Sequence, residues 1–508
     1  MARRRKVKCD ETYPRCLRCV STGRACNSYL EPLSVSPSSL HAFVTSSSDK
    51  QALEWLKLRT ITKLPGTFRC DFWSKLVFQA AASQPAPRHA ALALGAAHRR
   101  LVLGKTDSAE MEILAIRHHS SAIFHLQPCF SSIKDINSLQ VVLIVCLIFA
   151  SLDVLRGHMV SAQHHVRSGL AILKLSESTI GSQVDEWISE AFIRLQVQLA
   201  LLCPSYTSSV SFLPHSSSSQ SRNTIPRHFR SLKLAWDNLA TIMIDIIFLQ
   251  QNYAQNIPVQ YDSARRAAFA KQQQLALSGL RRWQTSYQNA YDRGCLMDLA
   301  KFPPNEKTKA TSNIQVYHIL TTIMAQMCLC PGDEMAFDTQ NFHFAQLLGQ
   351  LQILFGTDDL GNNTSPEPGA ISQLDQSIVD LGCIIPLYYL ATKCRAHSLR
   401  TRALRMLQSV HHREGLWDAK IAALVAQKII ELEESGLSYD SIFRSQNSSS
   451  LSDSQRVGSL EISISGNPTE KVRVLGTKST DRRLATCVAE IDVAPERLTS
   501  LCATSGRA

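Results

Sequence analysis

Residues 139–155 read LQVVLIVCLIFASLDVL, and this stretch decides the fold. Every position from Val141 to Ala150 is apolar, so a helix over 137–153 is apolar nearly all round and belongs in the centre of a core. A bilayer span needs about 20 apolar residues. This run has only ten and is bounded by Gln140 and Ser151. The stretch therefore predicts a buried helix and no membrane span.

Helical periodicity continues on both sides of this segment, from about residue 51 to 435. The expected helices are 88–103, 110–127, 157–175, 183–202, 228–252, 263–290, 311–329, 338–355, 371–398 and 417–435. Gly157, after Arg156, suits the left-handed position at a helix end and predicts a helix stop and restart. The alternation of apolar and polar residues is too weak to predict a sheet, so the predicted fold class is all-α.

Serine-rich stretches interrupt and follow the helical region. Residues 204–226 contain nine serines in 23 positions, and 438–466 contain eleven in 29. Such composition buries too little apolar surface to offset its ordering entropy. The sequence therefore predicts a disordered insertion at 204–226, a disordered Ser-rich tail over 436–508 and a Ser/Pro linker over 30–50. The linker shows no leucine heptad.

Charge is concentrated at the amino end. The 508-residue chain carries a net charge of +12, and residues 1–30 supply eight Lys/Arg against two acids. A concentrated basic patch indicates a polyanionic partner, nucleic acid before membrane. The start lacks the apolar stretch of a secretory signal, so we expect an intracellular protein with reduced thiols.

Four of the fifteen cysteines lie together at this basic end: Cys9, Cys16, Cys19 and Cys26. Thiolates in pairs two residues apart are frequent zinc ligands, and a module of about thirty residues needs a metal in place of a core. Chance clustering and disulfides are the alternatives, and disulfides fit an intracellular chain poorly. The other eleven, such as Cys146 and Cys383, are interpreted as small buried hydrophobes.

The segment RRRKVKCDETYPRCLRCVSTGRAC resembles the fungal binuclear zinc cluster transcription factors. In that family six cysteines hold two zinc ions, and the four cysteines here correspond to the third to sixth. The first C-x₂-C is absent, because the second ligand would fall at Ala2. Two interpretations stay open: a longer chain that begins upstream, or a remnant that holds one zinc ion or none.

The resemblance also implies roles for the basic residues. Lys6, three residues before Cys9, corresponds to the lysine that reads a CGG-type triplet in the major groove, where guanine N7 and O6 accept hydrogen bonds. The other DNA-binding candidates, which would contact phosphates, are Arg3, Arg4, Arg5, Lys8, Arg15 and Arg18. A nuclear-localisation patch is the alternative reading of the same run, and both roles can coexist.

Residues 51–435 resemble the fungal-specific transcription factor domain, which implies a helical regulatory domain. The histidine pairs of this region have no acidic or cysteine partner at ligand spacing, and no catalytic motif occurs, so we expect no enzyme. The leading hypothesis is a nuclear, zinc-dependent, sequence-specific regulator of RNA polymerase II transcription that binds double-stranded DNA. The alternative is a regulatory protein that has lost DNA binding and acts through its helical domain. A homodimer and a small-molecule effector are further open partners.

Overall fold

The structure is a computed structural model of the whole chain. It describes residues 46–67, 70–103, 108–131, 135–179, 184–202, 225–255, 263–299, 302–355, 379–435, 451–466, 468–478 and 486–493. The predicted zinc module, most of the linker and nearly all of the predicted insertion at 204–226 lie outside the described residues.

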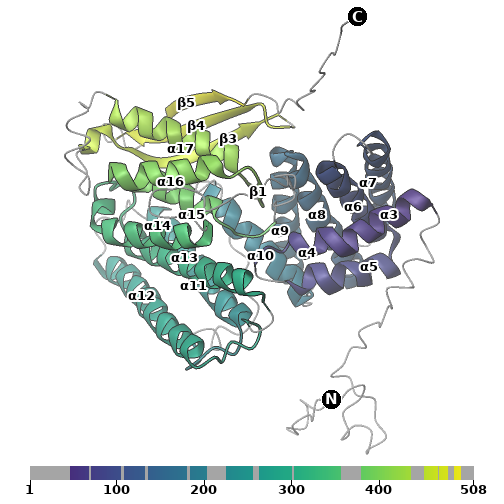
Figure 1. Cartoon of the computed structure of the whole chain (residues 1–508), viewed down its shortest axis with the longest axis horizontal. Coiled ribbons are helices and arrows are strands. Elements are labelled where there is room, and N and C mark those ends of the chain that lie inside the picture. The colour runs from purple at the N-terminus through teal and green to yellow at the C-terminus, as the bar shows by residue number, and fades with distance from the viewer. Residues whose placement is uncertain are drawn as a thin grey trace, which may run out of the picture.

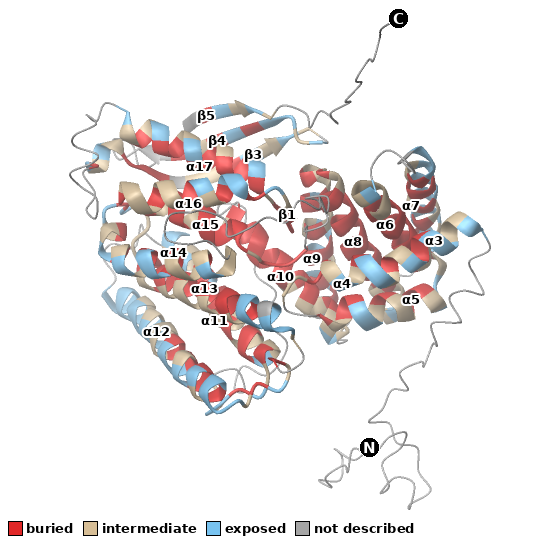
Figure 2. Ribbon diagram, viewed as in Figure 1, coloured by how far each residue is buried: buried red, intermediate tan, exposed pale blue. Residues whose placement is uncertain are grey.

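The first half of the described chain is a stack of helices around α8, on the right in Figure 1. Its elements are α3 (Ser47–Trp55), the π-helix η2 (Leu56–Thr60), α4 (Ile61–Lys63), the π-helix η3 (Phe72–Leu76), α5 (Val77–Ser83), α6 (Pro85–Leu103), α7 (Ser108–Ser131), α8 (Ile136–Arg156), α9 (Met159–Thr179) and α10 (Glu186–Leu202). Helix α8 is buried from Val141 to Leu155 and contacts α6, α7, α9 and α10. Figure 2 shows this concentration of buried residues.

The second half packs further helices against one another and covers them with a small sheet (Figure 1). Its elements are α11 (Leu232–Gln255), α12 (Ser263–Asp292), α13 (Pro304–Met327), the 3-10 helices η7 (Ala336–Gln340) and η9 (Asp453–Gln455), α14 (Asn341–Phe355), α15 (Ile384–Lys393), α16 (His397–Ser409), β1 (Arg413–Glu414), β2 (Trp417–Asp418), α17 (Ala419–Glu434), β3 (Val457–Ser465), β4 (Lys471–Lys478) and β5 (Thr486–Asp492). One continuous apolar core joins both halves.

The predominantly helical fold is confirmed, and most expected helices occur near their expected bounds. The structure differs at 371–398, where α15 ends at Lys393 and α16 begins at His397. Extended backbone at Cys394 and Ala396 separates the two helices. This break turns the side chain of Arg395 into the interior, where only 2% of the residue is exposed.

The predicted stop and restart after α8 is confirmed. Gly157 is the C-cap of α8, with φ of 78° in the left-handed region, and its N–H bonds back to the carbonyls of Asp153 and Val154. An L-residue with a side chain adopts this φ at a cost that glycine avoids. The chain then turns into α9 at Met159, which packs against α8.

The structure differs from the expected disordered tail, because residues 457–492 contain a three-stranded antiparallel sheet in the order β3-β4-β5. Val457 pairs with Lys478, and Lys471 pairs with Asp492. Ile462, Val472, Val474 and Ala489 are buried, whereas Lys471, Arg473 and Glu490 are exposed. One apolar face therefore packs inward, and β5 contacts α17. The serine-rich composition predicted too little buried apolar surface for an ordered structure. The buried face of the sheet supplies that surface.

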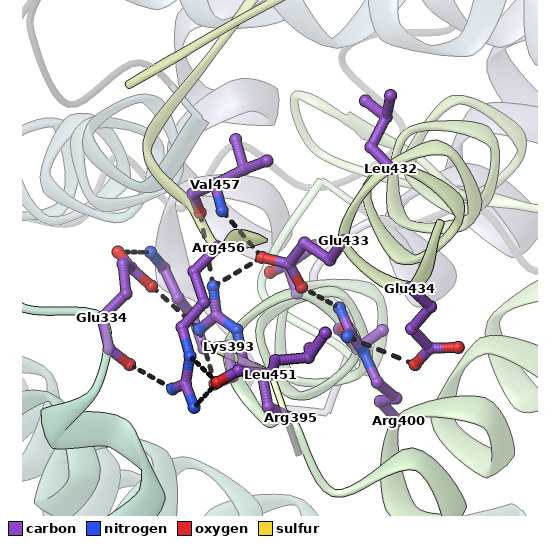
Figure 3. A network of polar contacts seen from close by, with 12 residues as sticks. Glu334, Lys393, Arg395, Arg400, Leu432, Glu433, Glu434, Leu451, Arg456 and Val457 are labelled. Carbon is purple, nitrogen blue, oxygen red and sulfur yellow. Dashed lines mark hydrogen bonds and ion pairs between the residues drawn. The ribbon is translucent and has the colours of Figure 1, made fainter. Parts of the chain in front are cut away.

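A buried network of charges attaches the sheet to the helices (Figure 3). Glu433, at the end of α17, accepts hydrogen bonds from Arg395 at 2.9 Å and from Arg400 at 2.7 Å, and the three side chains are 0% exposed. Its Oε1 also accepts from the N–H of Val457 at 2.9 Å, at the start of β3. Burial acts to raise the pKa of Glu433, but the two guanidinium groups outweigh it and the pKa lies below its ordinary value.

The network extends to the segment that precedes β3. Arg456 donates to the Glu334 carbonyl at 2.8 Å and pairs with Asp338 at 2.7 Å. Glu334 in turn pairs with Lys393 at 2.7 Å and with Arg395 at 2.8 Å. Glu434 lies 3.5 Å from Arg400 and brings the acids of this network to four, against the four bases Lys393, Arg395, Arg400 and Arg456. The charges therefore balance, as expected of a buried ionic cluster.

One helix among the described residues, α8, is long and apolar enough to cross a membrane by length and composition. Of its most apolar window, 83% is buried inside the protein. This burial agrees with the expectation that the segment is a core helix.

Replacing Glu433 by Gln should destabilise the protein by about 3–5 kcal/mol, because Arg395 and Arg400 would lose the carboxylate that they share and the buried network would keep an uncompensated positive charge. Urea unfolding measures the change. Glu431→Gln on the same helix is the matched control, because its pair with Lys428 is solvent-exposed, and it should change stability by less than about 0.5 kcal/mol. Equal losses in the two variants would contradict the assignment.

Acid should weaken the fold through His318. This imidazole bonds to the Leu280 carbonyl at 3.2 Å and stacks on Trp283, and burial lowers its pKa from 6.5 to about 4. Between these values the unfolded chain binds a proton that the folded chain does not, so the free energy of unfolding falls as pH falls. In His318→Gln this fall should be smaller by roughly 1–2 kcal/mol between pH 6.5 and pH 4.5. Identical pH profiles by urea unfolding would contradict the prediction.

Candidate functional site

The residues expected to hold zinc and DNA lie outside the described residues. These are Cys9, Cys16, Cys19 and Cys26, and Arg3, Arg4, Arg5, Lys6, Lys8, Arg15 and Arg18. Their roles therefore stay predictions. The donor set itself fits zinc, because four thiolates can form one tetrahedral shell or four of the six ligands of a two-zinc cluster.

The described chain begins where the N-terminal segment joins the helical domain. Ser46 caps α3, its side chain accepting a hydrogen bond from the N–H of Asp49 at 3.0 Å. Ser48 donates to Glu110, in the first turn of α7, at 2.6 Å. Helix α3 also packs on α6. The N-terminal segment is thus attached to the α3–α6–α7 end of the domain.

The expectation that the histidines lack acidic or cysteine partners is wrong. Carboxylates lie close to several imidazoles: Asp49 to His118 at 3.0 Å, Asp153 to His165 at 3.5 Å and to His158 at 3.7 Å, and Glu414 to His412 at 3.0 Å. Asp49 comes from a helix far from its histidine in the sequence, so local spacing gave no sign of it. The expectation that these histidines are packed side chains holds for His119, whose ring lies against that of Phe149.

The buried His118 belongs to a small group of polar side chains whose other members are partly exposed. Its Nε2 contacts Asp49, its Nδ1 lies 2.8 Å from Nδ1 of His89, and His89 stacks on His125. Burial, followed by the neighbouring His118, lowers the pKa of His89 to about 4. His89 is therefore neutral at physiological pH. These histidines connect α3, α6 and α7, and their contacts are those of packed side chains.

The short hairpin β1–β2 lies at one of the places where the two halves of the domain meet. Arg413 donates to the Leu155 carbonyl at the end of α8 at 3.1 Å. Gln198 of α10 accepts from the N–H of Leu416 at 2.9 Å and donates to the Val379 carbonyl at 3.0 Å. The N–H of Leu416 is therefore satisfied by a side chain from an element far away in the sequence, and the side chain of Arg413 satisfies a carbonyl at the end of α8.

The hairpin also carries an acid that reaches α15. Glu414 accepts hydrogen bonds from the N–H groups of Cys383 and Ile384 at 2.9 and 2.8 Å. It thereby satisfies donors at the start of α15 that have no partner within the helix, and its charge complements the helix dipole. Sequence reasoning missed this residue, because nothing in its local context marks it.

The described cysteines that lie in the core behave as expected of small apolar groups. Cys146 and Cys383 are 8% and 7% exposed. Burial raises the pKa of Cys146 to about 12, and burial with the nearby Glu414 raises that of Cys383 well above its ordinary value. Both thiols are therefore protonated in the folded chain without metal.

A second polar centre surrounds Arg194 on α10. This guanidinium bonds to Asp380 and, at 2.7 Å, to Glu190, and lies 3.6 Å from Asp237. A cavity of about 30 Å³ adjoins it, lined in part by Cys70 and Trp73. That volume suits one or two water molecules. A small-molecule effector at this place would require the surrounding side chains to move.

Two family models match the chain. The fungal Zn(2)-Cys(6) binuclear cluster domain matches residues 3–36, and the fungal specific transcription factor domain matches residues 58–256. The first match contains the four N-terminal cysteines and the basic run. The second begins in η2 and ends after α11, so it contains the α8 core.

Two curated relatives support the same assignment. The aspercryptin biosynthesis cluster-specific transcription regulator atnN of Emericella nidulans is 31% identical over 33% of this chain and 33% of its own length. The transcription regulator lscL of Purpureocillium lilacinum is 28% identical over 34% of this chain and 47% of its own length. The chain thus spans between a third and a half of these relatives. No solved structure matches.

The matched domains fit the features found in the chain. A binuclear cluster domain binds zinc through cysteine thiolates, and the clustered cysteines supply them. The helical domain supplies a packed core around α8. Residues 3–36 are therefore similar to the fungal Zn(2)-Cys(6) binuclear cluster domain, and residues 58–256 are similar to the fungal specific transcription factor domain.

Proposed function

We propose that the N-terminal module, held by zinc, reads CGG-like triplets in the major groove and directs RNA polymerase II transcription. The observation that carries the proposal is the joint occurrence, within residues 3–36, of the cluster-domain match, the cysteines and the basic run. A module of this size is organised by its metal, so the metal would hold the adjacent cationic side chains in one geometry.

The basic residues divide into two roles. Lys6 donates to guanine N7 and O6, which lie side by side in the major groove. The arginines and Lys8 contact phosphates, and the free energy of these contacts depends on salt and not on sequence. Residues 1–30 carry eight Lys/Arg against two acids, and this net charge of +6 favours binding to a polyanion.

The helical domain would regulate the module and would not catalyse a reaction. It has a filled core, its fully buried Glu433 is paired with Arg395 and Arg400, and its relatives are transcription regulators. The function places the protein in the nucleus, where double-stranded DNA is its partner. One triplet gives little specificity, so a second copy of the chain would be needed to read a second half-site.

Lys6→Ala should weaken binding to a CGG-containing duplex by about 1–3 kcal/mol, that is, roughly 5- to 150-fold, and reduce discrimination against a mutated triplet. Electrophoretic shift titrations measure both quantities. Arg3→Ala should weaken all duplexes alike and reduce the salt dependence. Lys307→Ala, an exposed position on α13, is the control and should change neither.

Zinc removal gives an independent test of the same proposal. A chelator should abolish the shift, and added zinc should restore it, because the module has no other core. Binding that is indifferent to both chelator and Lys6→Ala would contradict DNA reading. That result would favour the alternative, a regulatory protein that acts through its helical domain alone.

A further inference from the structure

Three metal-binding side chains converge inside the helical domain, far in sequence from the N-terminal cysteines. Cys383 is the N-cap of α15, His412 immediately precedes β1, and Glu414 lies in β1. Their Sγ, Nε2 and carboxylate oxygen atoms all lie within 4.8 Å of one another. The side chain of Glu414 is 2% exposed and that of His412 is 16% exposed. The cluster is therefore interior, with its imidazole nearest the solvent.

The separations of these atoms match those of a zinc coordination shell. Glu414 Oε1 lies 3.0 Å from His412 Nε2 and 3.3 Å from Cys383 Sγ. In a tetrahedral zinc site, with bonds of about 2.0 Å to N and O and 2.3 Å to S, the ligand atoms are roughly 3.3–3.5 Å apart. Both separations from the carboxylate oxygen are therefore within a few tenths of an ångström of those in a zinc shell, and Cys383 Sγ and His412 Nε2 lie within 4.8 Å of each other.

The carboxylate is held in place by groups that would also support a metal. The N–H groups of Cys383 and Ile384 donate to its two oxygens. Gly382 provides the space for this approach, because a Cβ there would lie 2.3 Å from Glu414 Oε1. Ligating carboxylates in metal sites are oriented by hydrogen bonds of this kind.

Charge and proton balance also favour a divalent cation. In the metal-free chain the thiol and the imidazole N–H both point at Glu414 Oε1. A cation would take the place of these two protons: the thiol proton leaves to solvent, and the imidazole carries its proton on Nδ1 and leaves Nε2 free to ligate. One thiolate, one carboxylate and a divalent cation sum to zero charge, which a buried site requires. A water molecule on the side of His412 would complete the shell.

We propose that Cys383, His412 and Glu414 form a zinc site in the helical domain, separate from the N-terminal cluster. The mixed thiolate, imidazole and carboxylate donors favour zinc over calcium or magnesium, which prefer oxygen ligands. The metal would join α15 to the hairpin that contacts α8 and α10, and so would clamp the two halves of the domain together.

The test uses the full chain with Cys9, Cys16, Cys19 and Cys26 all replaced by Ser, so that the N-terminal ligands are absent. This variant should bind one equivalent of Zn²⁺ by mass spectrometry of metal content, and of Co²⁺ with the absorption of a cobalt–thiolate bond. Zinc should also raise its unfolding temperature, and a chelator should reverse the rise.

Further substitutions in this background assign the ligands. Cys383→Ser should remove the cobalt–thiolate absorption, and His412→Gln should weaken metal binding at least tenfold. Cys394→Ser is the matched control, because Cys394 is also buried but lies near Asn341, 3.8 Å away, and it should bind metal as before. If Cys383→Ser does not fold, metal binding by His412→Gln tests the proposal, because His412 is partly exposed and its replacement is less disruptive.

Two results would overturn the proposal. One is a folded parent variant that takes up no zinc or cobalt when either is in excess. The other is metal binding that His412→Gln and Cys383→Ser leave unchanged. Because the N-terminal cysteines are absent throughout, neither result depends on whether the chain reads DNA.

Discussion

The pairing of Glu433 with Arg395 and Arg400 is the constraint on which the architecture depends. All three side chains are fully buried, so each charge is tolerable only while its partners are present. Arg395 lies in the break between α15 and α16, Arg400 lies in the first turn of α16, and the acid lies in the last turn of α17. The N–H of Val457 completes the shell of the carboxylate. The C-terminal sheet is therefore part of the folding unit of the helical domain and not an appendage to it.

A chain of polar contacts connects this centre with the first half of the domain. Helix α15, which ends next to Arg395, begins at Cys383, whose N–H donates to Glu414 of the hairpin. The hairpin in turn bonds to the end of α8 through Arg413 and to α10 through Gln198. Polar groups buried at these positions specify one arrangement of the two halves. A shift of one half relative to the other would leave buried hydrogen-bond donors or acceptors unpaired.

The sequence predicted those features that come from local pattern. The apolar run of α8, the glycine cap at Gly157 and most helix positions follow from composition and periodicity. The strands of the tail were also visible, since residues 460–465 read LEISIS and 471–474 read KVRV, with strict alternation. Their serine-rich surroundings concealed this signal. The two-residue strands of the hairpin are too short for any periodicity to reveal.

The buried charges could not be predicted, because their pairing is set by tertiary contacts. Arg395 and Glu433 are 38 positions apart, and each looks like a surface residue when considered alone. The same reason hid the approach of Cys383 to His412 and Glu414. The candidate DNA-binding residues are the opposite case, since contiguous motifs mark them in the sequence.

The two groups of metal-binding side chains differ in what a metal contributes to the fold. A module of about thirty residues is too small to bury a core, so zinc binding would supply most of its folding free energy. The cluster at Cys383 lies in a core already formed by apolar packing, and its carboxylate is fully hydrogen-bonded without a cation. A metal there would add stability according to its free concentration and affinity. Zinc at the N-terminal cysteines would therefore determine whether the module folds at all. Zinc at the Cys383 cluster would change only how tightly the two halves of the helical domain are held together.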